Sequence, residues 1–405
     1  MKKIIPVLAI VCLAWAITAQ DLQHEVTTLN IEVPVRVFQG DTFVSDLTLE
    51  DFEIFEDDKP QKIDAVYLIK KTVIERKDEV KQFSPQTARH FFLFFEITEF
   101  NAKLAGAVDY FLANVFLPGD ELTIVTPRKT YRMKDETMQK LPREVVVEQL
   151  KEKIREDSWL GNSEYRSAMQ DLEGLVRSLS GSLQGGLAVE GNSGAAYQGM
   201  ELDEKVQFLD PLMSSLENLR RIEQKKLLDF AEYLKDKSGQ KTVFLFYQRE
   251  FLPKLEPQTL QALIAENQDS PQIQAMLYSF MEFYRRDITF DVDKVKQAFS
   301  DSSIGIHFLY FTQPAEIIPG IYMQEQSEDI FSAFTEMAQA TGGLATSSSN
   351  PEFLFQKASD ASENYYLLYY TPQAYQADGK FKNIHVKVKG KSYRITHRAG
   401  YFADS

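Results

Sequence analysis

The stretch HFFLFFEITEF, residues 90–100, places an acid, Glu96, at the end of an apolar run of strand length. The residues from Asn101 onward have the pattern of a helix that begins with a capping residue. In α/β folds, the carboxyl end of a strand is the usual position for a ligand or a metal. We therefore ask first whether this strand end can still hold one.

Other residue types that perform chemistry do not form a recognisable site. The five histidines are scattered, with no pair spaced three or four residues apart, which argues against a zinc site. The only cysteine, Cys12, lies in the N-terminal apolar segment, so we expect no thiol nucleophile in the mature chain. Neither a Gly-x-Ser-x-Gly motif nor a phosphate-binding loop is present. The acids Asp291 and Asp293 lack the glycine and distal glutamate of a calcium loop, so we expect them on the surface.

Residues 1–19 are typical of a secretory signal peptide: Lys2 and Lys3, an apolar core, and then small residues. Cleavage could follow Ala16 or Ala19. The apolar core is shorter than the roughly 20 residues of a spanning helix, so we expect export to the periplasm or the outside without stable membrane insertion. The formal net charge is −14 at pH 7, and nucleic acid is not an expected partner of so acidic a chain.

Both ends of the mature chain alternate apolar and polar residues, which is typical of half-buried β-strands. Residues 22–75 and residues 364–405 each hold too few strands for a core of their own. We therefore predict that the N- and C-terminal strands together form one β-sandwich. The tyrosines of the YYLLYY segment are divided between two faces by the alternation, so we expect them to pack within the sheets.

The middle of the chain, residues 88–363, alternates strand and helix patterns. The predicted strands at 90–98, 242–247 and 304–312 are continuously apolar, as in a parallel sheet that is covered on both faces. A long helix is predicted over 203–237 and a helical insertion over 256–300. The predicted fold class is therefore α/β, a doubly wound, mostly parallel, Rossmann-like sheet with the β-sandwich attached.

Several segments, in their order along the chain, resemble the secreted bacterial proteins called VWFA-related domain proteins. They include LNIEVPVRVFQGDTFVSDLTLEDFEIFEDDKPQKI, HFFLFFEIT, LLDFAEYLKDKSGQKTVFLFY, FTEMAQATGGLAT and ENYYLLYYTPQ. The most specific parts are the Leu-Thr-x-Glu-Asp-Phe element at 47–52 and the Arg-x-Gly-Tyr-Phe element at 398–402. The resemblance implies a von Willebrand factor A fold in the middle of the chain, and it implies no defined reaction.

The resemblance also implies a place for a divalent cation, built from Asp-x-Ser-x-Ser after the first strand, a loop threonine, and an aspartate after the fourth strand. In this chain Glu96 stands at the aspartate position and Thr98 at the first serine position, but Phe100 offers no oxygen. The fourth strand is followed by Tyr-Gln-Arg-Glu at 247–250, without the aspartate. Because Mg²⁺ prefers six oxygen ligands, we expect a degenerate site with Glu96 and Thr98 as the remaining metal ligands and no cofactor. Bound Mg²⁺ is the alternative.

The expected function is non-enzymatic binding of an unidentified protein partner. The partner would dock at the carboxyl ends of the strands, with Glu99, Arg249 and Glu250 as the ligand-binding candidates. One alternative is a divalent-cation-dependent adhesion module. A second alternative is a hydrolase whose site the sequence does not reveal.

Overall fold

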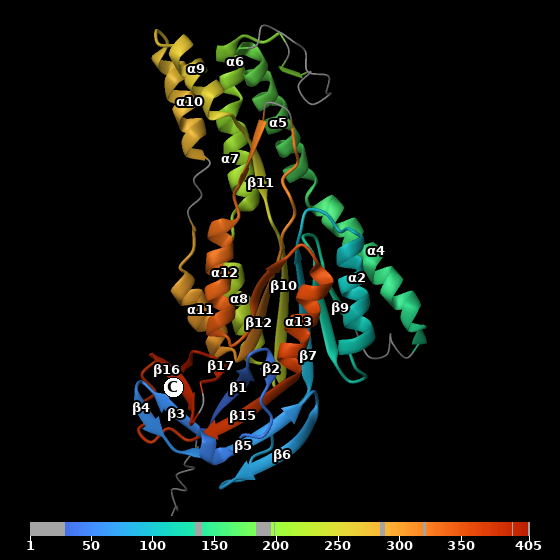
Figure 1. The fold of residues 1–405 in the computed structure, drawn as a ribbon, viewed down its shortest axis with the longest axis vertical. Coiled ribbons are helices and arrows are strands. Elements are labelled where there is room, and N and C mark those ends of the chain that lie inside the picture. Colours follow the sequence, from blue (N-terminus) through green and yellow to red (C-terminus); the bar gives the residue numbers. More distant parts are fainter. Residues whose placement is uncertain are drawn as a thin grey trace, which may run out of the picture.

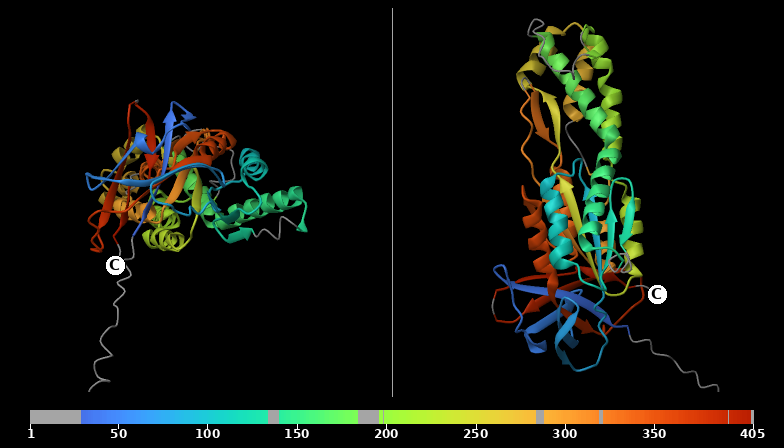
Figure 2. Two further views of the ribbon diagram at one scale, coloured as in Figure 1. Left: turned by 90° about the horizontal axis from the view of Figure 1, so that it is seen from below. Right: turned by 90° about the vertical axis from the view of Figure 1, so that its right-hand side faces the viewer.

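The computed structural model describes residues 29–133, 140–183, 196–197, 199–283, 288–318, 321–390 and 392–403. The predicted signal peptide, residues 1–19, and most of the glycine-rich run at 181–199 lie outside these residues. The described part is elongated and has three levels: antiparallel sheets at one end, a mostly parallel sheet in the middle, and a group of helices at the other end (Figures 1 and 2). No helix among the described residues has both the length and the apolar character that a membrane crossing requires.

The central sheet has the strand order β14-β12-β10-β7-β8-β9. Its strands are β7 (Arg89–Glu96), β8 (Glu121–Val125), β9 (Thr130–Met133), β10 (Gln240–Gln248), β12 (Ile304–Phe311) and β14 (Ala345–Ser348). Neighbouring strands are parallel, except that β9 pairs antiparallel with β8 at one edge. The predicted α/β class with a mostly parallel sheet is therefore confirmed.

Helices cover both faces of the central sheet. On one face lie α2 (Ala102–Tyr110), the π-helical turn η2 (Phe111–Val115), α4 (Arg143–Gly161) and α13 (Pro351–Glu363). On the other face lie α8 (Gln224–Lys235), α11 (Val292–Asp301) and α12 (Glu328–Ala340). The side chain of Asn101 caps α2 by accepting hydrogen bonds from the backbone N–H groups of Lys103 and Leu104, both at 3.1 Å.

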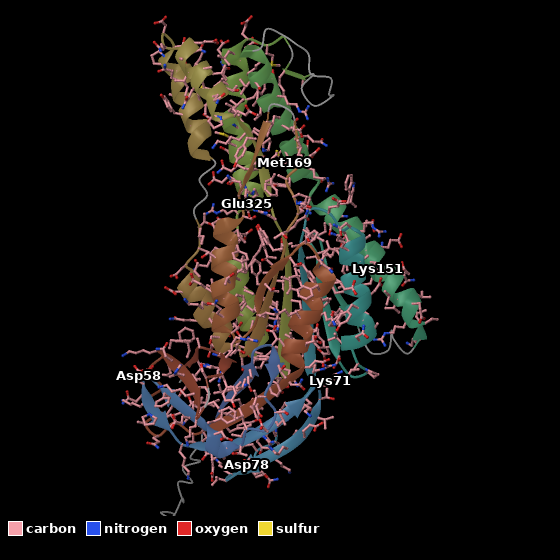
Figure 3. All side chains as sticks on the ribbon, in the orientation of Figure 1. Asp58, Lys71, Asp78, Lys151, Met169 and Glu325 are labelled. Carbon is pink, nitrogen blue, oxygen red and sulfur yellow. The ribbon has the colours of Figure 1, made fainter. Side chains whose placement is uncertain are left out.

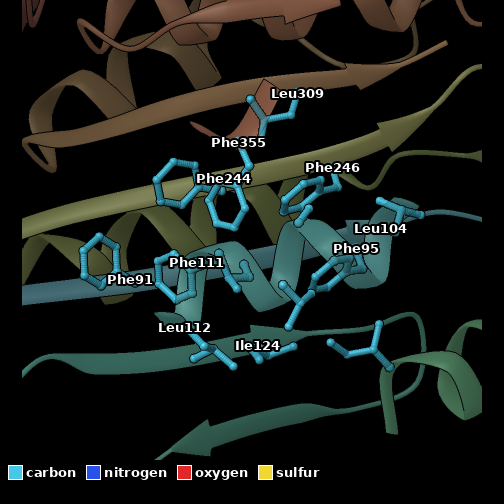
Figure 4. Packing of buried hydrophobic residues seen from close by; sticks show 14 of the residues in the cluster. Phe91, Phe95, Leu104, Phe111, Leu112, Ile124, Phe244, Phe246, Leu309 and Phe355 are labelled. Carbon is cyan, nitrogen blue, oxygen red and sulfur yellow. The ribbon is translucent and has the colours of Figure 1, made fainter. Parts of the chain in front are cut away.

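Aromatic side chains fill the layer between the central sheet and the helices of the first face (Figure 4). The rings of Phe95 on β7 and Phe246 on β10 are stacked with centroids 4.9 Å apart. On the same face, the ring of Phe355 from α13 stacks on that of Phe111 at 5.1 Å. Because successive residues of a strand point to opposite faces, the continuous apolar run of β7 supplies both cores, with Phe92 in the core of the second face.

The N- and C-terminal strands interleave in two antiparallel sheets, which we call the sandwich. The first sheet has the order β17-β1-β15-β5-β6, with β2 paired to β1, and the second has the order β18-β16-β3-β4. The strands of the first sheet are β1 (Ile31–Gln39), β2 (Thr42–Phe43), β5 (Ile63–Lys70), β6 (Val73–Glu79), β15 (Asn364–Tyr370) and β17 (Arg394–His397). Those of the second are β3 (Phe52–Glu56), β4 (Lys59–Gln61), β16 (Phe381–Val388) and β18 (Gly400–Phe402). The predicted attachment of both chain ends in antiparallel sheets is thus confirmed.

The tyrosines of β15 are divided between the two faces of their sheet. Tyr366 and Tyr370 lie in the core between the two sheets of the sandwich. Tyr365 and Tyr369 lie in a separate cluster on the outer face of the first sheet. All four are buried, which confirms that they pack within the protein.

The third level, which we call the upper helices, has its own hydrophobic core. It contains α5 (Ser163–Leu183), α6 (Leu202–Gln207), α7 (Leu209–Arg220), α9 (Pro257–Glu266) and α10 (Pro271–Phe283). A two-stranded ribbon of β11 (Phe251–Leu255) and β13 (Ile321–Glu325) supports these helices. The sequence did not predict this ribbon, since each strand is only five residues long and β11 contains Pro253.

The long helix predicted over 203–237 is interrupted in the structure. Helix α7 ends at Arg220 and α8 begins at Gln224. The two helices bury their apolar faces in different cores, because Leu216 packs among the upper helices and Leu234 packs on the central sheet. The helical insertion predicted over 256–300 is likewise divided between two cores. Helices α9 and α10 pack among the upper helices, and α11 packs on the central sheet.

Two phenylalanines of α13 test how much the central core contributes to stability. Phe355 is fully buried, whereas Phe353, two residues earlier, is 51% exposed. We expect Phe355→Ala to lower the free energy of unfolding by roughly 3–5 kcal/mol, because it removes a large side chain from a packed core. The matched control Phe353→Ala should change the free energy by less than about 0.5 kcal/mol. Urea unfolding measures both, and equal losses would contradict the assignment of the core.

Candidate functional site

The strand order of the central sheet reverses between β7 and β10. The chain proceeds from β7 toward β8 on one side, while β10 leads toward β12 on the other side. In open α/β sheets, the crevice at the carboxyl ends of two such strands is the usual ligand position. Here a cavity of about 180 Å³ lies at these ends. The junction of α4 and α5 and the junction of α7 and α8 also line it, so the upper helices cover this edge of the sheet.

Gln248, at the end of β10, connects the two strand ends. Its side chain is 4% exposed, and its Oε1 accepts three hydrogen bonds from the segment after β7. The donors are the backbone N–H of Thr98 at 3.0 Å, the hydroxyl of Thr98 at 3.2 Å and the backbone N–H of Glu99 at 3.4 Å. An amide oxygen of the protein therefore binds the groups that this segment would otherwise present to a ligand.

Asn162 holds the same segment from the side of the upper helices. Its Nδ2 donates to the carbonyl oxygen of Ile97 at 2.9 Å and to that of Ser158 at 2.8 Å. The first bond spans 65 residues of sequence, and the second closes the end of α4. The segment after β7 is thus fixed both to β10 and to the α4–α5 junction.

Glu250 forms an ion pair with Arg220 at the end of α7. Its Oε2 accepts from Nη2 of Arg220 at 2.8 Å and from Nε at 3.1 Å. Its Oε1 accepts from the hydroxyl of Tyr247 at 3.3 Å, and its backbone N–H donates to Oγ of Ser327 at 3.1 Å. The positive charge beside this carboxylate therefore comes from the upper helices of the chain itself.

Arg249 takes part in a different ion pair, on the β13 side of the strand. Its guanidinium binds the carboxylate of Glu325 and lies over the ring of Phe251, 5.0 Å from the centroid. Figure 3 marks Glu325 at the level where the central sheet meets the upper helices. The hydroxyl of Tyr310 also donates to Glu325, at 2.9 Å. The hydrogen bond from Arg249 is the main cause of the lowered pKa of Glu325.

Glu96 is the acid of this cavity that forms no hydrogen bond or ion pair with the described part of the chain. Glu96 is exposed to solvent because it lines the cavity. Protein forms the remaining walls of the cavity and surrounds the side chain. This surrounding protein raises the pKa of Glu96 by disfavouring the charged form, and Glu250 raises the pKa further by repulsion. The more distant Lys226 opposes both effects.

The oxygen atoms at this edge do not fit a resident Mg²⁺ ion. Phe100 is buried in the core, with its ring packed against that of Phe95 at 6.1 Å. The hydroxyl of Thr98 is hydrogen-bonded to Gln248, which occupies the position after the fourth strand. Within the described ranges, no three His, Cys, Asp or Glu side chains come together as a metal site. Glu96 alone remains as a charged donor that is not engaged by another side chain, far short of the near-octahedral set that Mg²⁺ requires.

The structure brings three of the five candidate residues together. Glu96, Thr98 and Glu250 line the cavity, whereas Glu99 is exposed and Arg249 turns toward Glu325. Gln248, Asn162 and Arg220 also belong to the site, and they were not predicted from the sequence. The position of Gln248 directly after a buried strand was a usable signal. Asn162 and Arg220 carry no such signal, because their place depends on how the upper helices pack.

Searches of protein-family models and of curated proteins found no match to this chain. Among solved structures, the crystal structure of the human COPII-coat protein Sec24c is similar with a TM-score of 0.30 and 8% sequence identity. The match covers 78% of this chain and 44% of that chain, so this protein spans less than half of the length of Sec24c. A similarity at this TM-score supports no conclusion about function, and the fold class rests on the strand order itself.

The raised pKa of Glu96 predicts a pH-dependent effect of Glu96→Gln. An acid whose pKa is raised by folding destabilises the folded state when it is ionised, so the stabilising effect of removing the charge is present at neutral pH. This effect should decline as the pH falls through the raised pKa, and it should vanish below the ordinary value of 4.5, where wild type is protonated in both states. Thermal melts between pH 4 and pH 8 measure it.

The matched control for this experiment is Glu99→Gln, which neutralises an exposed acid on the same segment. We expect this variant to differ little from wild type at any pH. A stability difference between Glu96→Gln and wild type that does not change with pH would contradict the described environment of Glu96.

Proposed function

We propose that this protein is an exported, non-enzymatic binding module that contacts its partner at the carboxyl ends of β7 and β10. The observation that carries the proposal is the carboxylate of Glu96. It faces a cavity at the reversal point of the sheet, while Thr98 and Glu250 beside it are engaged by Gln248 and Arg220. An acid that has no partner among the described residues can accept a hydrogen bond or a positive charge from a ligand.

The size of the cavity favours a single side chain of a protein partner as the ligand. Small-molecule sites usually have volumes of roughly 300–1,000 Å³, whereas this cavity has about 180 Å³. A lysine or arginine side chain from a partner would bring its cation to Glu96 and gain a charge-assisted hydrogen bond. The partner class is therefore a protein with an exposed basic residue.

The polar groups around Glu96 support binding rather than catalysis. Gln248 and Asn162 carry amides, which neither take up nor release protons, and Glu250 is paired with a guanidinium. Acid–base catalysis places titratable groups within hydrogen-bonding reach of the reacting atoms, and Glu96 is the carboxylate of this cavity that forms no ion pair in the described chain. The resemblance to VWFA-related domain proteins and the N-terminal signal pattern are consistent with an exported module of this kind.

The metal-independent nature of the site predicts that divalent cations leave the stability unchanged. We expect the Tm of the mature protein in millimolar Mg²⁺ or Mn²⁺ to agree with the Tm in EDTA to within about 1 °C, because a cation that does not bind the folded state cannot stabilise it. A rise of several degrees that Glu96→Ala abolishes would instead support the alternative of a cation-dependent adhesion module.

Reversal of the charge at Glu96 should abolish partner binding. The mature protein, immobilised, is used to capture proteins from the envelope and secreted fractions of the source organism. We expect Glu96→Lys to lose a protein that wild type retains, in the presence and in the absence of EDTA, because the new cation repels the basic side chain of the partner.

The matched control is Glu99→Lys, which makes the same charge change on the exposed part of the same segment. We expect this variant to keep the captured protein. Identical capture by wild type and Glu96→Lys would refute the proposed site, and an equal loss with Glu99→Lys would place the contact outside the cavity.

A further inference from the structure

A second polar cavity lies at the opposite end of the central sheet, where the sheet meets the sandwich. Its volume is about 50 Å³, and it lies between β1, the first residues of β10 and β12, and the segment that precedes β18. Three basic residues from these separate parts of the chain line it: Arg36, Lys241 and Arg398. This cavity has no residue in common with the cavity beside Glu96.

All three basic side chains are buried. Arg36 is 9% exposed, and Lys241 and Arg398 are each 7% exposed. Their polar contacts within the protein are few: Nη1 of Arg36 donates to the carbonyl oxygen of Gly342 at 3.4 Å, and Nζ of Lys241 donates to that of Leu234 at 2.8 Å. The Nε atoms of Arg36 and Arg398 are buried and have no hydrogen-bond partner among the described residues.

The acids near the cavity do not neutralise these three cations. Glu32 lines the cavity, but it is exposed and accepts a hydrogen bond from the hydroxyl of Tyr369 at 2.9 Å. Asp301, whose charge acts on Arg398 and Lys241, pairs with Lys235 at 2.8 Å. Within the part of the chain that the structure describes, none of the three cations forms an ion pair. The cavity therefore carries an excess of positive charge.

Such an arrangement costs free energy unless a counter-charge is present, because an uncompensated charge loses its hydration on burial. Burial lowers the pKa of both guanidinium groups and lowers the pKa of Lys241 to about 8. Lysine can release its proton in response, but arginine stays charged in proteins. At least two positive charges thus remain beside the cavity at neutral pH.

We propose that this cavity binds a small inorganic anion between Arg36, Lys241 and Arg398. The two guanidinium groups and the ammonium group on its lining are all hydrogen-bond donors, and such cationic donors suit an anion between chloride and phosphate in size. A single water needs roughly 10–15 Å³ of such space, so the cavity of about 50 Å³ has room for roughly three to five waters or one such anion. Access is from the side of Glu32 and Gln86, which are both exposed and line the cavity.

The bound anion connects three parts of the chain that are far apart in sequence. Arg36 belongs to the N-terminal strand β1, Lys241 to the central strand β10, and Arg398 to the C-terminal segment. The anion therefore stabilises the attachment of the sandwich to the central sheet. The only cysteine of the sequence, Cys12, lies in the predicted signal peptide, so no disulfide of the mature chain can provide this connection. The proposal is independent of the function proposed for the cavity beside Glu96.

The experiment compares the Tm of the mature protein in chloride, phosphate and sulfate with its Tm in gluconate at the same ionic strength. Gluconate serves as the reference because it is too large for a cavity of this size. We expect low millimolar amounts of at least one inorganic anion to raise the Tm of wild type by about 3 °C or more. The three anions, tested separately, identify the size and charge that the cavity accepts.

The variants Arg36→Met and Arg398→Met separate specific binding from general salt effects, since phosphate and sulfate also stabilise proteins by exclusion from the surface. Each variant should lose the rise in Tm, yet in gluconate each should be at least as stable as wild type, because it removes an unpaired buried charge. The matched control Arg394→Met, an exposed arginine of β17, should keep the rise.

A flat response of wild type to all three anions would overturn the proposal, and so would an equal rise in wild type and all variants. If Arg36→Met and Arg398→Met do not fold, X-ray diffraction from wild-type crystals tests the proposal instead. Crystals grown in gluconate and soaked in bromide should show an anomalous peak within hydrogen-bonding distance of Arg36 and Arg398, and the absence of a peak there refutes the anion site.

Discussion

The burial of β7 and β10 on both faces is the constraint on which the rest of this structure depends. Both strands carry large apolar side chains at successive positions, so each face of the sheet must be covered. The stacked rings of Phe95 and Phe246 and the ring of Phe355 fill one face, and α8, α11 and α12 cover the other. Strands that are covered in this way are open to ligands mainly at their two ends, and both candidate sites lie at these ends.

Each end of the central sheet has a cavity whose lining includes charge that forms no ion pair within the described chain. At the carboxyl ends of β7 and β10, Glu96 faces its cavity without a partner in the described chain. At the other end, Arg36, Lys241 and Arg398 surround a smaller cavity without ion pairs. In each place the described chain leaves charged groups of the lining without an ion pair. Arg36, Lys241 and Arg398 are buried, and unpaired buried charges are costly, which makes them better candidates for ligand contacts than the many paired charges of the surface.

The upper helices decide which groups at the carboxyl end of the sheet remain accessible to a ligand. In an open sheet, the segment after the first strand would be accessible to a partner or a metal. Here Arg220 from α7 neutralises Glu250, and Asn162 from the α4–α5 junction binds the backbone after β7. Together with Gln248, these residues supply from within the chain the charge and hydrogen bonds that a cation and its waters would otherwise supply. The opening that remains suits one side chain.

The local pattern of residues was enough to predict the elements and the layers. Continuous apolar strands between amphipathic helices predict a covered, mostly parallel sheet, and the alternating strands at both chain ends predict antiparallel sheets, because these patterns follow directly from how side chains point along a strand. The position of Glu96 at a strand end and the lack of an oxygen on Phe100 were also readable from the sequence. The partners of these residues could not be predicted from the sequence. Gln248 lies 150 residues from Thr98, and Arg398 lies more than 300 residues from Arg36. No local pattern encodes such pairs, since only the packing of the upper helices and of the sandwich against the central sheet decides which polar groups meet and which charges remain unpaired.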